Sequence, residues 1–82
     1  MFTLKFIKFT DEGEMISNIS VPNYRVFKRN YSDVITVGVY ETLFDVDGVE
    51  RHISSFDRDY DICFVTNVQG NTIDCIKAVR ND

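Results

Sequence analysis

The stretch YDICFVTNVQGNTIDCIKAV, residues 60–79, decides the fold class. It holds two runs rich in Ile, Val, Phe and Thr, separated by a short turn that ends on Gly70. β-Branched and aromatic residues favour strands, and Gly completes a three-residue hairpin loop because it adopts the left-handed conformation without steric cost. The stretch therefore predicts an antiparallel β-hairpin.

Counting outward from the loop gives a register for this hairpin. It pairs Asn67 with Asn71, Val65 with Ile73, Cys63 with Cys75, and Asp61 with Lys77. The opposite charges of the last pair favour this register, because such cross-strand pairs are mildly stabilising. Opposed cysteines lie near enough for oxidation to join them, but in a chain without an export signal we expect reduced thiols packed as small apolar groups.

The rest of the chain repeats the same pattern. Period-two runs of β-favouring residues alternate with short polar turns, and two more turns end on glycine, at Gly13 and Gly48. A change of phase near Ile7 predicts a bulge in the first run, and SSFDRDYD, residues 54–61, offers Ser54 or Ser55 as the cap of a short helical turn. No apolar stripe of helical period extends over ten residues, so we expect little or no helix.

Hairpin runs that are apolar on both faces need a cover on each side. We therefore predict an all-β chain, with residues 1–82 forming a single β domain: a small antiparallel barrel-like or sandwich fold built from short hairpins, which self-associates. The 82 residues, 44% of them hydrophobic, suffice for one core. The first ten residues carry Lys5 and Lys8 inside an apolar run, unlike a signal peptide, so we expect a soluble, cytoplasmic protein.

The segment NYRVFKRNY, residues 23–31, is the strongest candidate binding site. It sets three cations among three aromatic rings without an acid, in a chain with a net charge of −4. Guanidinium groups can grip a phosphate bidentately while a ring stacks on a base. The candidate ligand-binding residues are Tyr24, Arg25, Phe27, Lys28, Arg29 and Tyr31. The alternative is that Phe27 enters the core while the cations protect an edge strand from pairing.

The other polar clusters give weaker indications of a functional site than this segment does. Asp57, Asp59 and Asp61 alternate like the start of a calcium loop, but its sixth and twelfth positions hold Ile62 and Val68 instead of Gly and Glu. The single histidine, His52, lacks a recognisable set of catalytic neighbours. We therefore expect no catalytic residues, no metal and no cofactor, and no enzyme activity.

The segments TVGVYETLFDVDGVERHI and FVTNVQGNTIDCI resemble the small all-β accessory proteins of tailed bacteriophages. The resemblance implies a counter-defence role in the host cytoplasm, either by sequestering a nucleotide signal or by gripping a host protein.

Two functions follow. In the first, the chain is a non-enzymatic binding protein that sequesters an anionic, nucleotide-like ligand at the interface of a homo-oligomer, through the cations and rings named above.

In the alternative, a protein-interaction module inhibits a host macromolecular complex by direct binding, with acidic residues facing a basic partner. The candidate partner-binding residues are Asp45, Asp47, Asp57 and Asp59. A third interpretation is an assembly component whose basic strand meets the acidic segment of the next copy. Neither membrane nor nucleic acid is an expected partner, and no run of residues approaches the length of a membrane span. The modest net charge also argues against a mimic of nucleic acid, which needs a dense acidic array.

Overall fold

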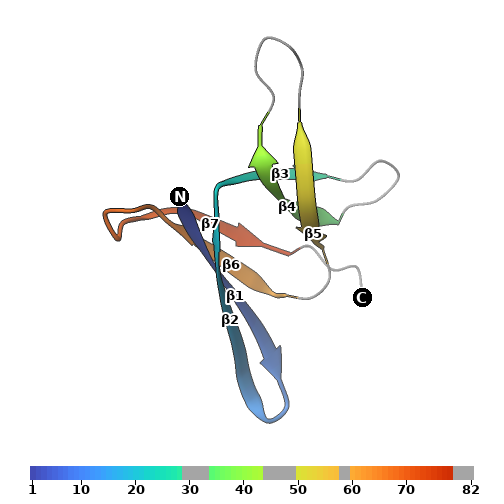
Figure 1. The fold of residues 1–82 in the computed structure, drawn as a ribbon. Coiled ribbons are helices and arrows are strands. Elements are labelled where there is room, and N and C mark those ends of the chain that lie inside the picture. The colour runs from blue at the N-terminus through green and yellow to red at the C-terminus, as the bar shows by residue number, and fades with distance from the viewer. Residues whose placement is uncertain (29–33, 44–49, 58–59, 79–82) are drawn as a thin grey trace.

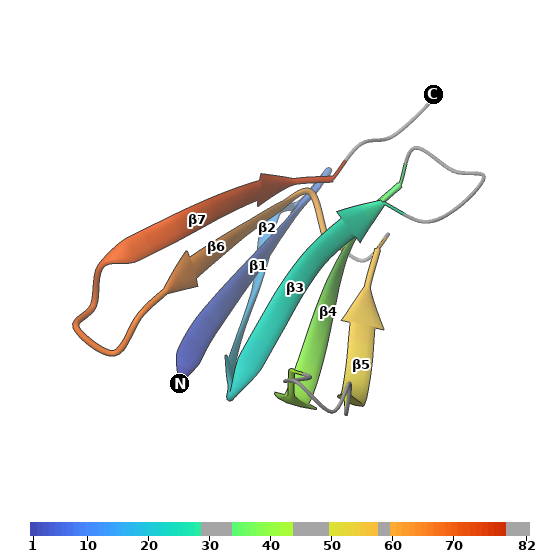
Figure 2. The same ribbon diagram turned by 90° about the horizontal axis from the view of Figure 1, so that it is seen from above.

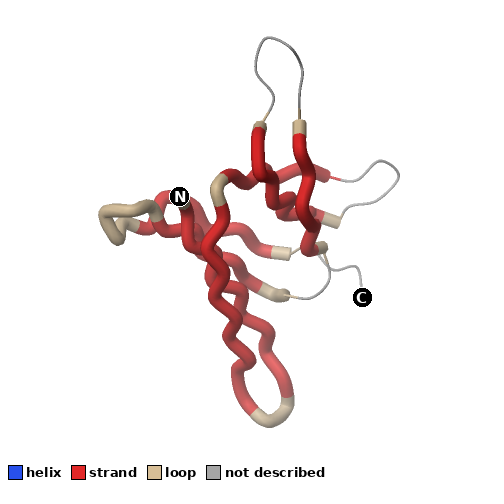
Figure 3. The backbone as a smooth tube through the Cα atoms, in the orientation of Figure 1, coloured by secondary structure: helices blue, strands red, loops and turns tan. Residues whose placement is uncertain are grey.

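A computed structural model describes residues 1–28, 34–43, 50–57 and 60–78, and this part of the chain is built from strands (Figure 1). The strands are β1 (Phe2–Thr10), β2 (Gly13–Val21), β3 (Asn23–Lys28), β4 (Ile35–Thr42), β5 (Arg51–Phe56), β6 (Ile62–Thr66) and β7 (Thr72–Lys77). The described residues contain no helix (Figure 3), and hence none that could cross a membrane.

The strands form two antiparallel sheets. The first has the order β2-β1-β6-β7, and the second has the order β3-β4-β5. The chain passes from one sheet to the other at Pro22, between the end of β2 and the start of β3. Proline has no backbone N–H to donate to a ladder, so it suits a strand end. The predicted all-β fold is confirmed, and its form is sandwich-like: the sheets are not closed into a barrel.

The core lies between the two sheets. Figure 2, seen from above, shows β1, β6 and β7 on one side and β3, β4 and β5 on the other. Phe6 of β1 contacts the rings of Phe56 and Tyr60, with centroids 4.6 and 5.2 Å away. The buried members of the core are Leu4, Phe6, Val21, Val37, Val39, Tyr60, Cys63, Val65 and Ile76. Side chains from both sheets thus interlock, as in larger β-sandwiches.

Two of the three predicted glycine turns lie in the described residues, and both are hairpin turns. Gly13 and Gly70 adopt positive φ angles of 126° and 84°, which glycine tolerates best. Asn67 and Asn71 close the second loop, with Asn67 N donating to Asn71 O at 2.9 Å. The third turn, at Gly48, lies outside the described residues.

The predicted register of the β6–β7 hairpin holds at the loop, where Thr66 faces Thr72, but it is wrong by one residue from Val65 onward. A bulge beside Val65 leaves Ile73 unpaired, so that Cys63 faces Ile76 and Cys75 faces Phe64. The two cysteines therefore lie on opposite faces of the sheet, and both are free thiols. Asp61 does not face Lys77: it extends the contact with β1, where its Oδ2 accepts a hydrogen bond from Phe9 N at 2.7 Å.

Two smaller expectations are also wrong. β1 pairs with β2 without interruption from Phe2 to Thr10, so no bulge occurs near Ile7. Ser54 and Ser55 lie within β5 and cap no helix.

Candidate functional site

The outer face of the β3-β4-β5 sheet carries a polar cluster on residues that the core does not need. Arg25 pairs with Gly38, and Phe27 pairs with Thr36. Val37 and Val39 belong to the core. Because side chains alternate along a strand, Arg25 and Phe27 point away from the core. This position of Phe27 contradicts one part of the alternative, the burial of Phe27 in the core. The other part, cations on an edge strand, agrees with the structure, because β3 forms an edge of its sheet.

Tyr24 points the other way. Its ring packs edge-on against Phe2, with centroids 5.2 Å apart, and its hydroxyl donates to Asp74 Oδ2 at 3.2 Å. Burial and the nearby carboxylate both raise the pKa of Tyr24. The structure therefore uses Tyr24 to join the two sheets and separates it from Arg25.

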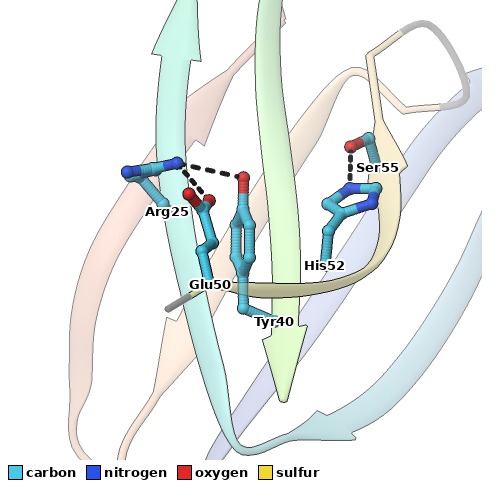
Figure 4. A network of polar contacts seen from close by, with 5 residues as sticks. All are labelled: Arg25, Tyr40, Glu50, His52 and Ser55. Atoms are coloured by element: carbon cyan, nitrogen blue, oxygen red, sulfur yellow. Dashed lines mark hydrogen bonds and ion pairs between the residues drawn. The ribbon is translucent and has the colours of Figure 1, made fainter. Parts of the chain in front are cut away.

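Tyr40 and Glu50 are partners of Arg25 (Figure 4). Its Nη2 donates to the hydroxyl of Tyr40 at 3.4 Å and forms an ion pair with Glu50. Its guanidinium carbon also lies 5.1 Å from the centroid of the Tyr40 ring, a cation–π distance. The bond to Tyr40, followed by the Glu50 carboxylate, raises the pKa of Arg25. The guanidinium is thus a fixed cation on the outer face, and its side chain remains 40% exposed.

Tyr40 itself is only 3% exposed, although it lies on the outer face. Its ring covers Gly38, two residues earlier in β4 on the same side. A Cβ atom at Gly38 would lie 2.7 Å from Tyr40 Cε2, closer than packed atoms allow. Gly38 therefore makes room for the ring, which is one of the uses of glycine inside a strand.

β5 contributes His52 and Ser55 through an irregular register. His52 pairs with Tyr40, and Ser54 pairs with Val39, so that Ile53 is left without a partner. This extra residue places His52 and Ser55, three positions apart, on one face. His52 Nε2 lies 2.6 Å from Ser55 Oγ, and its ring meets Tyr40 edge-on at 5.2 Å (Figure 4). Since the described residues supply no carboxylate to orient the imidazole, we assign no catalytic step to this pair.

Thr36 lies on the same face, beside Phe27. Its side chain is fully buried, and Oγ1 has no hydrogen-bond partner among the described residues. A buried hydroxyl without a partner is costly, so such a group calls for an explanation, and a functional role is one. The outer face of this sheet thus combines a fixed cation, three aromatic rings and a hydroxyl that no described residue satisfies.

The structure brings together only part of the predicted ligand-binding set. Arg25 and Phe27 share the outer face, Tyr24 does not, and Lys28 is exposed at the end of β3 on the Tyr24 side. Arg29 and Tyr31 lie outside the described residues, as do Asp45, Asp47 and Asp59 of the alternative acidic set. Asp57 is half-buried after β5.

Sequence reasoning missed Tyr40 and Glu50. Glu50 is 25 residues from Arg25, and no local pattern joins them. For Tyr40 a signal existed, because Gly38 and Tyr40 stand two apart in a strand-like run, where a ring can lie over a glycine. No family model matches this chain, and neither the curated proteins nor the solved structures include a match to it.

Proposed function

We propose that this chain is a binding protein without turnover, which holds an anionic, nucleotide-like ligand on the outer face of the β3-β4-β5 sheet. The observation that carries the proposal is the Arg25 guanidinium, which is oriented by Tyr40 and Glu50 beside aromatic rings while its side chain remains 40% exposed. Sequestration of a nucleotide is one of the two roles that the resemblance to phage accessory proteins implies.

In this proposal Glu50 occupies the place of the ligand's phosphate. A carboxylate and a phosphate offer the same pair of oxygens to a guanidinium, and phosphate carries the larger charge. Ion pairs near the surface contribute only about 0–1 kcal/mol, so exchanging Glu50 for a phosphate costs little. Arg25 would keep its orientation during the exchange, because the Tyr40 ring still lies beneath the guanidinium.

The aromatic residues give the site its preference for a base. Phe27 lies on the same face as Arg25, two positions along β3, and the exposed His52 ring lies against the buried Tyr40 ring. Phe27 and His52 are therefore the rings that a base can reach. Stacking of a base on an aromatic side chain contributes about 1–3 kcal/mol. A nucleotide should therefore bind better than its phosphate chain alone.

The test is isothermal titration calorimetry with ATP and with tripolyphosphate, at low salt. Arg25→Ala should weaken ATP binding at least about tenfold, and Glu50→Gln should strengthen it, because it removes the competing charge. Arg51→Ala is the matched control: Arg51 lies on the same sheet, in an exposed ion pair with Glu41 at 3.8 Å. Equal loss in the Arg25 and Arg51 variants would indicate general charge attraction and would refute the site.

A further inference from the structure

The outer face of the β2-β1-β6-β7 sheet, opposite to the core, carries a group of large apolar side chains, bordered on one side by a polar row of Ser20, Thr3 and Thr66. The registers place two continuous rows on this face: Asn18, Lys5, Phe64 and Cys75 in one, and Ile16, Ile7, Ile62 and Lys77 in the next. Phe9 and Glu14 follow as a third pair. Phe9 and Ile16 are 53% and 49% exposed, and Ile7, Ile62 and Phe64 are partly exposed outside the core cluster. We call this surface the outer apolar face.

Such a face is unusual for a chain that remains single. Antiparallel sheets normally cover one face with a core and turn polar residues to water on the other. Five large apolar side chains in adjacent rows form instead the kind of patch that marks an interaction site. The β1–β2 hairpin, which reaches beyond the other strands in Figure 1, extends this face past the rest of the sheet.

We propose that the outer apolar face binds a second copy of this chain, about a two-fold axis that runs parallel to the strands between β1 and β6. Ile7 and Ile62 are cross-strand neighbours on either side of this axis, as are Lys5 and Phe64. The axis therefore sets Ile7 of each copy on Ile62 of the other. An isologous contact of this kind covers both apolar faces at once.

The charges at the edges of the face favour a second copy as the occupant. Glu14 on β2 and Lys77 on β7 lie at opposite edges of one sheet, separated by three strand spacings, or about 14 Å. They are too far apart to pair within one chain. The proposed axis places Lys77 of the second copy opposite Ile16, which is two residues from Glu14 along β2. Lys77 of each copy can therefore pair with Glu14 of the other. These two symmetric ion pairs border the apolar rows.

The size of the face also suits a small dimer. Four strands spaced about 4.8 Å apart and about seven residues long cover roughly 450 Å² of plane area per copy. Two copies then bury on the order of 1,000 Å² of pleated surface, near the lower limit for specific interfaces. We expect a dissociation constant in the micromolar range. This interface lies on the sheet that does not carry Arg25, so the ligand site stays open in the dimer, in contrast to the expectation of a ligand held between subunits.

Sedimentation velocity over a range of protein concentrations tests the proposal first. The wild-type chain should shift from monomer to dimer, and Glu14→Lys or Lys77→Glu should each weaken the dimer about tenfold. The double variant with both changes should recover most of the wild-type affinity, because the ion pairs form again with reversed charges. A wild-type chain that remains monomeric up to about 500 µM, far above the expected dissociation constant, would overturn the proposal.

Cysteine cross-linking tests the position of the axis. The axis relates Asn18 of one copy to the neighbourhood of Cys75 of the other, whereas within one chain they lie at the two edges of the sheet, too far apart for a disulfide. Asn18→Cys should therefore give a covalent dimer on mild oxidation, and adding Cys75→Ser should abolish it. A cross-link that survives Cys75→Ser, or no cross-link in a chain that dimerises, would refute this axis. Thermal melting of each variant confirms that the fold is intact.

Discussion

The Tyr40 ring lies directly over Gly38, at a distance that leaves no space for a side chain on that residue. Gly38 shows no positive φ, so its backbone conformation is open to any residue and only the contact with the ring demands glycine. This contact positions the ring beneath the Arg25 guanidinium.

Gly38→Ala should therefore destabilise the protein by about 1–3 kcal/mol, the usual cost of overpacking. Urea denaturation measures the loss. The matched test is the same change in a Tyr40→Ala background, where the ring is gone and the added methyl should cost little. An equal loss in both backgrounds would mean that the ring is not what requires glycine at this position.

Tyr60 should make the fold sensitive to alkali. Burial, followed by the neighbouring Cys63 and Asp57, raises the pKa of Tyr60 to about 12. In the unfolded chain it titrates near 10, so between about pH 10 and 12 only the unfolded state loses the proton, and stability falls with rising pH. The part of this decrease in unfolding free energy that is due to Tyr60 should approach about 3 kcal/mol.

Tyr60→Phe provides the control for this pH dependence. It removes the titrating group together with the hydrogen bond from the hydroxyl to Ile35 O, 3.2 Å long, which costs about 1 kcal/mol at neutral pH. Chemical denaturation at a series of pH values should show a shallower alkaline decline in the variant. An unchanged slope would show that another group controls the alkaline loss.

The two cysteines should differ strongly in reactivity. Cys75 is exposed, whereas Cys63 is buried, and burial raises the pKa of Cys63 to about 12. Since the thiolate is the reactive form, a thiol reagent at pH 8 should modify one cysteine in the folded monomer, at protein concentrations below the expected micromolar dissociation constant, and two in denaturant. Cys75→Ser should remove the fast reaction. Rapid modification of Cys63 in that variant would contradict its position in the core.

The sequence predicts the class of fold and the hairpins well, because these follow from local chemistry. Gly13 and Gly70 mark the two hairpin turns, and the alternation of apolar and polar residues identifies the strands on either side. The register of β6 and β7 depends instead on a contact from elsewhere. The bulge at Ile73 places Asp74 on the core side opposite Val65, where Asp74 accepts the hydrogen bond from Tyr24. A hairpin considered alone gives no reason for this bulge.

In the candidate site, too, some features follow from the local sequence and others depend on contacts with distant residues. Alternation along β3 is local, and it is what separates Arg25 and Phe27 from Tyr24. The partners of Arg25 come from β4 and from the residue before β5, and only the three-dimensional pairing of the strands brings Tyr40 and Glu50 to it.

The most direct test of the proposed function is a titration of the ¹⁵N-labelled protein with ATP, followed by NMR. Binding at the proposed site should shift the Arg25 side-chain Nε–H signal and the backbone amides of Phe27, Gly38 and Ser55, and Arg25→Ala should abolish these changes. Signals of β6 and β7 should stay in place. Shifts confined to that other sheet, or no shifts at millimolar ATP, would contradict the account.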